Sequence, residues 1–247
     1  MTESLQGKIA VITGGNSGIG LAIAKRFVAD GAIVFIAGRR KDQLDKAVSE
    51  IGLNSIAVQT DVSKIEDIKH LFEVVKSSKF YKGKVDILIA NAGTGGIFSL
   101  DELTEEAYYN IFDINVKGVI FTVKEALPLL GKGSSVILTS SVGAFKGFPG
   151  STAYTASKAA VRSLARSWTV DFKGKGIRVN VVSPGPIDTP MLRDLGEEGI
   201  HKTEQVVPLG RIGEPAEAAS VYAFLASDES SFLTGADIQV DGGFAQI

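Results

Sequence analysis

Short apolar runs rich in β-branched residues alternate with segments of helical periodicity along nearly all of the 247 residues, and this alternation restricts the fold most strongly. A strand, a helix and a further strand in succession build parallel strands with crossover helices on both faces of a sheet. Runs such as residues 9–13 and 87–90 are apolar at almost every position, which is typical of strands buried on both sides. The sequence therefore predicts an α/β protein with one doubly wound, Rossmann-type parallel sheet, with ligands at the carboxyl ends of its strands.

The predicted strands comprise residues 9–13, 33–37, 56–60, 87–90, 136–139, 179–182 and 238–240. The predicted helices comprise residues 21–29, 44–51, 65–75, 108–130, 152–172 and 216–225. No repeat, low-complexity segment or linker divides the chain. We therefore expect residues 1–247 to form a single dinucleotide-binding and catalytic domain.

The composition disfavours several classes of function. Charged residues make up 22% of the chain and the net charge is −2, which does not favour a surface for nucleic acid or for a membrane. The chain has no cysteine, which excludes disulfides and thiolate metal sites, and no cluster of histidines and carboxylates suggests a metal. The N-terminus is polar, and no uncharged apolar stretch is long enough to span a bilayer. We expect a cytoplasmic protein.

A glycine-rich turn follows the first predicted strand and leads directly into the first predicted helix. It reads Thr-Gly-Gly-Asn-Ser-Gly-Ile-Gly over residues 13–20. Glycines allow the backbone to turn sharply and approach a pyrophosphate, and the N-terminus of the helix presents oriented N–H donors. Such a turn can also be purely structural, but its position at the start of a βαβ unit favours dinucleotide binding.

Tyr154 and Lys158 are one helical turn apart, downstream of Ser140 and Ser141, which follow the fifth predicted strand. A phenol with an ordinary pKa of about 10 is a poor proton donor or acceptor near neutral pH. A nearby ammonium group stabilises the phenolate, and lowering the phenol pKa to about 7 takes roughly 4 kcal/mol. A Tyr–Lys pair at this spacing is often only a surface pair. Together with the glycine turn, it indicates an enzyme in which Tyr154 is the general acid/base.

The order and spacing of these motifs resemble the short-chain dehydrogenase/reductase family in its single-domain form. The glycine turn has the spacing T-G-x-x-x-G-x-G instead of the common G-x-G-x-x-G. Further matches extend along nearly the whole chain: Asp61-Val62, Asn91-Ala92-Gly93, Asn115, Ser141, Tyr154, Lys158, Pro184-Gly185, Thr189 and Asp241-Gly242-Gly243. The resemblance implies an oxidoreductase that transfers a hydride between a nicotinamide dinucleotide and a carbonyl or secondary alcohol.

The resemblance also implies a role for each of four catalytic residues. Ser141, rather than Ser140, would hold the substrate carbonyl oxygen against Tyr154. Tyr154 would protonate the developing alkoxide, and Lys158 would bind the nicotinamide ribose and lower the pKa of Tyr154. Asn115 would anchor a water molecule that joins Lys158 to solvent, although an asparagine in a helix often makes only local backbone bonds.

The same resemblance implies which residues bind the dinucleotide. They are Gly14, Asn16, Ser17, Gly18, Ile19 and Gly20 in the glycine turn, Arg39, Arg40, Asp61 and Val62 around the adenosine, Asn91, Ala92 and Gly93 after the fourth strand, Tyr154 and Lys158, and Pro184, Gly185, Ile187 and Thr189 near the nicotinamide.

The end of the second predicted strand favours NADP(H) over NAD(H). Gly38 stands where NAD-specific members of the family carry an aspartate, and Arg39, Arg40 and Lys41 follow it. A carboxylate there would repel the 2′-phosphate, whereas a guanidinium binds phosphate with two parallel hydrogen bonds. The alternative is a solvated basic loop with Asp42 as the ribose-binding carboxylate, but Asp42 is better explained as the N-cap of the next helix.

The predicted surroundings of the catalytic residues are mostly apolar, which suits a hydrophobic ketone. The candidate pocket residues are Val142, Ala144, Phe145, Phe148, Met191, Leu192, Leu195 and residues 94–97. Residues 190–207 resemble the mobile substrate lid of the family. The resemblance further implies a homotetramer.

Four functions are compatible with the sequence. The first is an NADPH-dependent carbonyl reductase that works in reverse as an alcohol dehydrogenase. The second is a 3-oxoacyl-carrier-protein reductase, for which Lys132, Lys173 and Lys175 would form a basic docking patch. The third is a sugar or polyol dehydrogenase. The fourth is a nucleotide-binding regulator without turnover, which would not need the Tyr–Lys pair.

Overall fold

The computed structural model describes residues 4–246, in which seven strands form one parallel sheet in the order β3-β2-β1-β4-β5-β6-β7. The strands are β1 (Ile9–Thr13), β2 (Ile33–Gly38), β3 (Ser55–Gln59), β4 (Val85–Ala90), β5 (Leu130–Thr139), β6 (Arg178–Pro184) and β7 (Asp237–Val240). The chain starts at β1, moves outward to β3, and then returns to place β4 on the other side of β1. This reversal beside β1 is where doubly wound sheets bind their ligands. The predicted fold class and the seven predicted strands are confirmed.

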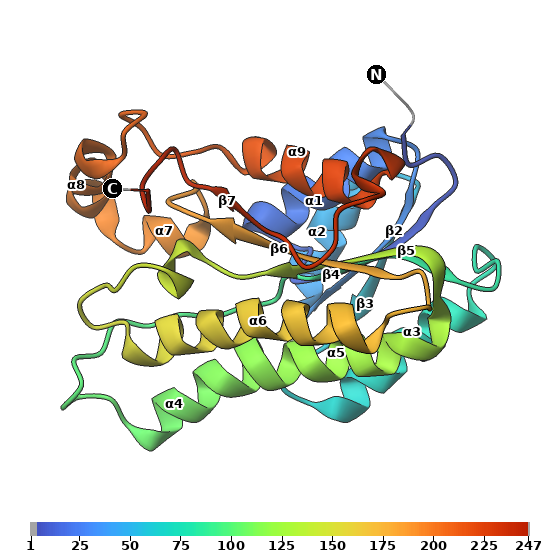
Figure 1. Ribbon diagram of the computed structural model, residues 1–247, viewed down its shortest axis with the longest axis horizontal. Coiled ribbons are helices and arrows are strands. Elements are labelled where there is room, and N and C mark those ends of the chain that lie inside the picture. The colour runs from blue at the N-terminus through green and yellow to red at the C-terminus, as the bar shows by residue number, and fades with distance from the viewer. Residues whose placement is uncertain (1–3, 247) are drawn as a thin grey trace.

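Helices cover both faces of the sheet (Figure 1). On one face lie α1 (Gly18–Ala29), α2 (Lys41–Ile51) and α9 (Pro215–Ala226), and on the other lie α3 (Ile65–Ser77), α4 (Glu105–Phe112), α5 (Gly118–Ala126) and α6 (Thr152–Asp171). Successive strand residues point to opposite faces, so that Ile12 joins the core under α1 and α9 while Val11 joins the core under α3 and α6. None of the helices within residues 4–246 is both long enough and apolar enough to cross a membrane.

The segment predicted as one helix over residues 108–130 is interrupted. A π-helical turn (Asp113–Lys117) separates α4 from α5, and a short 3-10 turn (Leu127–Leu129) ends α5 just before β5. β5 starts at Leu130, earlier than predicted. The π-helical turn holds the buried Asn115, which accepts a hydrogen bond from Thr94 N (2.8 Å) and donates one to Thr94 O (2.9 Å). The prediction was wrong because these contacts with a distant loop leave no trace in the periodicity of residues 108–130.

Two further segments differ from their predictions. Asp42 is not the N-cap of α2: Arg40 occupies that position, and Asp42 lies in the first turn, where a carboxylate interacts favourably with the helix dipole without capping. Residues 190–207, which were not among the predicted helices, contain α7 (Pro190–Arg193) and α8 (Gly196–Val206) beyond the carboxyl ends of the strands (Figure 1). Neither helix contains a fully buried residue.

The edge strand β7 packs closely against the end of β6 at Gly185. The amide of Gly185 donates to Val240 O at 3.0 Å. A Cβ atom on Gly185 would lie 2.5 Å from Asp241 Cβ and 2.7 Å from Asp241 Cα. Because one of these atoms belongs to the backbone, rotation of a side chain cannot relieve the contact.

We predict that Gly185→Ala lowers the free energy of unfolding by about 1–3 kcal/mol, the usual cost of an extra methyl group in a packed site. Gly147→Ala is the matched control, because no atom lies within 4 Å of its added Cβ. Urea unfolding of the two variants measures the difference. Equal stability of both variants would contradict the close approach of β7 to Gly185.

Candidate active site

A cleft of about 700 Å³ opens at the carboxyl ends of the strands. Its walls come from the turns after β1 to β6 and from the starts of α6 and α7. All of the predicted site residues except Asn115 line it: Gly14, Asn16, Ser17, Gly18, Ile19, Gly20, Arg39, Arg40, Asp61, Val62, Asn91, Ala92, Gly93, Ser141, Tyr154, Lys158, Pro184, Gly185, Ile187 and Thr189. The fold therefore brings together residues that are spread over most of the chain.

The glycine turn has a shape that only glycine permits at two positions. Gly14 has φ of 67°, in the left-handed region. A Cβ atom on Gly20 would lie 2.1 Å from Gly14 O, closer than any side chain allows. Ser17 is the N-cap of α1 but makes no capping bond with its side chain, so the first N–H groups of α1 stay available to an anion. These features fit the pyrophosphate of a dinucleotide.

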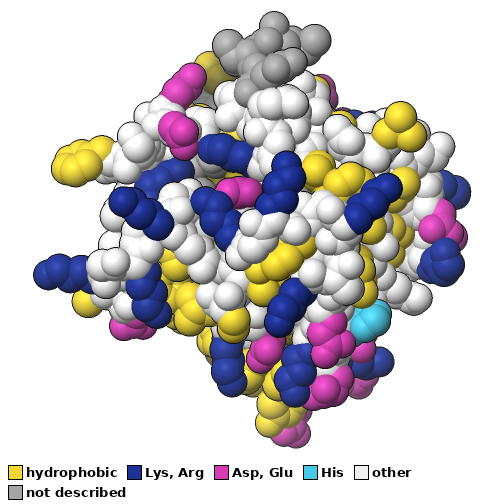
Figure 2. Space-filling view, turned by 90° about the vertical axis from the view of Figure 1, so that its right-hand side faces the viewer, with side chains coloured by type: hydrophobic (Ala, Val, Ile, Leu, Met, Phe, Trp, Pro, Cys, Tyr) yellow, Lys and Arg dark blue, Asp and Glu magenta, His cyan; other side chains and the backbone are white. Residues whose placement is uncertain are grey.

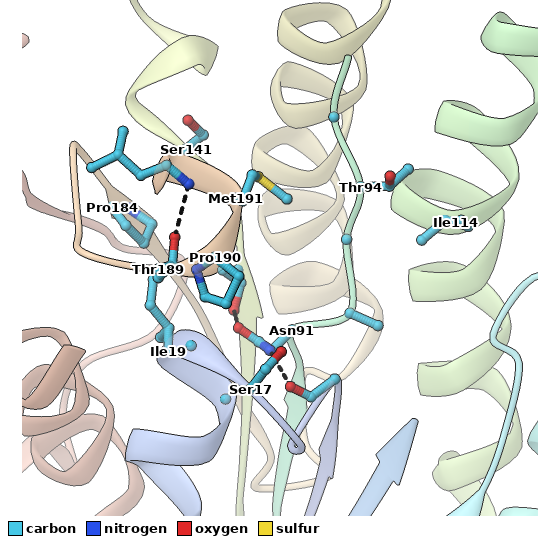
Figure 3. Close-up of a pocket in the computed structure, with 18 of the residues that line it drawn as sticks. Ser17, Ile19, Asn91, Thr94, Ile114, Ser141, Pro184, Thr189, Pro190 and Met191 are labelled. Carbon is cyan, nitrogen blue, oxygen red and sulfur yellow. Dashed lines mark hydrogen bonds between the residues drawn. The ribbon is translucent and has the colours of Figure 1, made fainter. Parts of the chain in front are cut away.

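Asn91 connects the loop after β4 to the glycine turn. Its amide nitrogen donates to Thr13 O at 3.1 Å and to Gly14 O at 3.3 Å. Figure 3 shows Asn91 beside Ser17, with Thr189 and Pro190 lying between this pair and Ser141 in that view. The hydroxyl of Thr189 accepts a hydrogen bond from Leu192 N at 3.3 Å and thereby caps α7.

Ser141, Tyr154 and Lys158 meet on one side of the cleft. The hydroxyl of Ser141 accepts from Gly143 N at 3.0 Å. Burial raises the pKa of Tyr154, and the neighbouring Ser141 hydroxyl opposes this rise only in part. Burial also lowers the pKa of Lys158 to about 8. Lys158 Nζ donates to Thr139 O at 3.1 Å and lies 5.8 Å from the centre of the Tyr154 ring.

The expected lowering of the Tyr154 pKa by Lys158 is not found in this structure. Burial acts on the phenol more strongly than any charge does, and Lys158 Nζ is held by Thr139 O instead of the phenol oxygen. The phenol therefore keeps its proton near neutral pH. Ser140 also lines the cleft, and its hydroxyl donates to Lys158 O at 2.8 Å.

Asn115 lies behind the cleft rather than in its wall. It is fully buried, and its side chain bonds both backbone groups of Thr94 and donates to Ser157 Oγ at 3.0 Å. Asn115 thus holds the loop after β4 against α6, next to Gly93 on one side and next to Lys158 on the other. Its role as an anchor for water stays a prediction.

Arg39 and Arg40 lie exposed at the far end of the cleft. A Cβ atom on Gly38 would lie 2.4 Å from Asn16 Oδ1, and Asn16 Nδ2 donates to Gln43 Oε1 at 3.0 Å. Asn16 therefore occupies the space that an aspartate at position 38 would need. Asp42 is absent from the walls of the cleft within residues 4–246, so it is poorly placed to bind the ribose.

The pocket beside Tyr154 differs in part from the prediction. Residues 94–97, Met191, Leu192 and Leu195 line the cleft. The predicted Val142, Ala144, Phe145 and Phe148 are absent from its described walls. Phe145 lies against the Arg162 guanidinium, 4.3 Å from ring centre to carbon, and Phe148 stacks on Phe244. Ser151 also lines the cleft, and no sequence motif pointed to it. Asp194, within residues 190–207, lines the cleft as well.

Comparisons with known proteins agree with this architecture. The family model described as enoyl-(acyl carrier protein) reductase matches residues 14–245. The oxidoreductase asL5 of Sarocladium schorii is 48% identical, over 99% of this chain and 98% of its own. The NADP-dependent (R)-specific alcohol dehydrogenase of Lentilactobacillus kefiri is 40% identical over 99% of each chain. The solved structure of a glucose/ribitol dehydrogenase from Brucella melitensis superposes with a TM-score of 0.94 at 34% identity, over 99% of each chain.

The glycine turn, the switch point beside β1 and the Ser141–Tyr154–Lys158 group occur in one cleft. The similarity to the family model and to these relatives extends over nearly the whole chain. The chain therefore belongs to the short-chain dehydrogenase/reductase family of oxidoreductases.

Proposed function

We propose that the protein is an NADP(H)-dependent reductase of a hydrophobic ketone, which in reverse oxidises the secondary alcohol. The proposal rests on one observation: Ser141, Tyr154 and Lys158 share a cleft with the glycine turn, and Arg39 and Arg40 lie at its far end. The NADP-dependent alcohol dehydrogenase among the similar proteins supports the same reaction class.

The residues of the cleft would divide the acid–base work. When bound, NADPH supplies the hydride that adds to the carbonyl carbon. Ser141 hydrogen-bonds the carbonyl oxygen, and Tyr154 gives its proton to the same oxygen. Because burial raises the pKa of Tyr154, the phenol is protonated near neutral pH, and release of its proton would depend on stabilisation of the phenolate by a nearby positive charge. Lys158, with a pKa of about 8, is still mostly charged at pH 7 and stabilises the phenolate that remains.

The arginine pair accounts for the proposed preference for NADP(H). Arg39 and Arg40 present two guanidinium groups, and a guanidinium matches the geometry of a phosphate. The side chain of Asn16 lies where a Cβ atom on Gly38 would be, so a carboxylate at position 38 would require Asn16 to move. The charge and the shape of this end of the cleft therefore favour a 2′-phosphate.

The pocket beside Tyr154 supports an apolar substrate. The side chains of Ile97, Met191 and Leu195 line the cleft and are 69%, 49% and 43% exposed. Covering this apolar surface with a substrate releases the most free energy when the substrate is itself apolar. We propose residues 190–207 as the lid that covers it, and a homotetramer as the assembly.

The lysines considered as a carrier-protein docking patch lie at the wrong end of the sheet. Lys132 is at the start of β5, whereas Thr139 ends β5 next to the cleft. At about 3.3 Å per residue, these two residues are separated by roughly 20 Å. Figure 2 shows the face away from α7 and α8, over which Lys and Arg side chains are spread. A carrier protein bound there would sit at the end of the sheet opposite to Tyr154, which favours a free ketone over a carrier-linked one.

Turnover tests the proposal directly. With NADPH, we expect purified protein to reduce aryl or alkyl ketones faster than 3-oxoacyl carrier thioesters, glucose or ribitol.

Tyr154→Phe should cut turnover by about a hundredfold or more, the usual scale for a general acid, and leave NADPH affinity nearly unchanged. Tyr108→Phe, on the exposed surface of α4, is the control. Undiminished turnover in Tyr154→Phe would refute the mechanism, and NADPH binding without any turnover would favour a regulator.

Arg39→Asp should shift the NADPH/NADH ratio of kcat/KM toward NADH by roughly tenfold or more, since a hydrogen bond to a charged group contributes about 1.5–3 kcal/mol. Lys46→Asp makes the same charge change on the exposed face of α2, outside the cleft, and should leave the ratio unchanged. Initial rates with both cofactors measure the ratio. An equal shift in the two variants would assign the effect to general electrostatics.

Burial of Lys158 should make stability depend on pH. The pKa of Lys158 is about 8 when folded and 10.5 ordinarily, so the unfolded state binds more protons between these values. Burial of the charged lysine therefore lowers the free energy of unfolding by its full amount below pH 8. This destabilisation disappears as the pH rises toward 10.5. Relative to Lys158→Met, the wild-type protein should gain stability from pH 7 to pH 10. Urea unfolding across this range checks it, and parallel pH profiles would contradict it.

A further inference from the structure

Tyr222 is a fully buried tyrosine on α9 that the proposed mechanism does not use. Its side chain lies in the core between α9 and the sheet. Burial of a phenol is unfavourable unless its hydroxyl finds a partner. The partner is Thr139, the last residue of β5, whose Oγ1 lies 2.8 Å from the phenol oxygen. Burial also raises the pKa of Tyr222, so the phenol remains a donor.

The direction of the hydrogen bonds around Thr139 follows from its single hydroxyl hydrogen. Thr139 Oγ1 donates to Asn91 Oδ1 at 3.3 Å. Because that bond uses the only hydrogen on the Thr139 hydroxyl, Tyr222 must donate to Thr139. Asn91 in turn donates to Thr13 O and Gly14 O. A chain of donors therefore runs from Tyr222 through Thr139 and Asn91 to the glycine turn.

Asn91 supports the glycine turn through direct contact as well. A Cβ atom on Gly20 would lie 2.7 Å from Asn91 Nδ2, and one on Gly14 would lie 3.0 Å from it. The amide of Asn91 is thus enclosed by the turn that faces the proposed pyrophosphate. A change in its orientation would change the positions of the carbonyl groups of Thr13 and Gly14.

Thr139 is also held from the opposite face of the sheet. Its carbonyl oxygen accepts the hydrogen bond from Lys158 Nζ, which belongs to α6. The side chain of Thr139 is bonded to α9 and its carbonyl to α6, so both helical layers fix this one residue. The two polar groups of Thr139 therefore connect the glycine turn with the proton-transfer residues.

We propose that Tyr222 is a positioning residue for dinucleotide binding. It orients the hydroxyl of Thr139, which orients the amide of Asn91, and this holds the glycine turn in the shape that receives the pyrophosphate. The inference rests on the proposed function, because it requires a dinucleotide at this turn. It adds to that function a contribution from a helix that does not line the cleft.

The test compares Tyr222→Phe with a matched variant on the same helix–strand contact. Ser135 is buried in β5, and its single hydroxyl hydrogen is donated to Leu225 O of α9 at 2.7 Å rather than to Asn91. Titration of NADPH against each folded variant gives Kd. Tyr222→Phe should weaken binding roughly three- to tenfold, a usual range for coupling through a network. It should raise KM for NADPH in the same proportion and change kcat less. Ser135→Ala should lower Tm and leave Kd unchanged.

A double-mutant cycle with Thr139 identifies the route. Thr139→Val should weaken NADPH binding at least as much as Tyr222→Phe, and adding Tyr222→Phe to it should change Kd no further. Thr139→Ser keeps the hydroxyl and should bind NADPH like the wild-type protein. If Tyr222→Phe does not fold, the comparison of Thr139→Val with Thr139→Ser still tests whether the Thr139 hydroxyl supports NADPH binding.

Four results would overturn the inference. They are an unchanged Kd in Tyr222→Phe, an equal loss of affinity in Ser135→Ala, equal binding by Thr139→Val and Thr139→Ser, and additive effects of Tyr222→Phe and Thr139→Val. Binding of neither NADPH nor NADH by the wild-type protein would instead refute the proposed function itself. The two failures are therefore distinguishable.

Discussion

The hydrogen bonds between the ends of β1 and β4 are the constraint on which the rest of the site depends. The hydroxyl of Thr13 accepts from Asn91 N and Ala92 N at 3.1 and 3.2 Å, and Asn91 returns a bond to Thr13 O. These two strands are neighbours because the chain reverses its direction across the sheet beside β1. The reversal leaves a space between the two connecting loops, and the bonds of Thr13 fix the width of that space.

Burial, rather than a close ion pair, determines the charge state of the catalytic candidates. Tyr154 and Lys158 are shifted in the directions that favour their neutral forms, since removal from water penalises each charge. For Tyr154 this shift keeps the proton that the proposed reduction would require. In that proposal, Lys158 would stabilise the phenolate once the proton has been transferred.

Several polar residues act on the backbone of the site rather than on a ligand. Asn115 binds both backbone groups of Thr94, and Ser140 binds the carbonyl of Lys158. Thr189 caps α7. Buried polar groups must be hydrogen-bonded, and here their partners are the loops that form the cleft. Two groups of side chains therefore hold the cleft in place. Sequence motifs mark some of them as functional, whereas no motif marks others, such as Ser157.

The sequence by itself determined the parallel sheet, the glycine turn and the Ser141–Tyr154–Lys158 group. Each of these depends on local properties: apolar runs for buried strands, glycine at a left-handed position, and residues one helical turn apart. Only the tertiary structure decided the π-helical turn at Asn115, the exclusion of Phe148 from the pocket and the bond between Tyr222 and Thr139. That bond joins residues 83 positions apart. Such contacts depend on how elements pack against each other, and a periodic pattern carries no information about the partner that an individual side chain will meet.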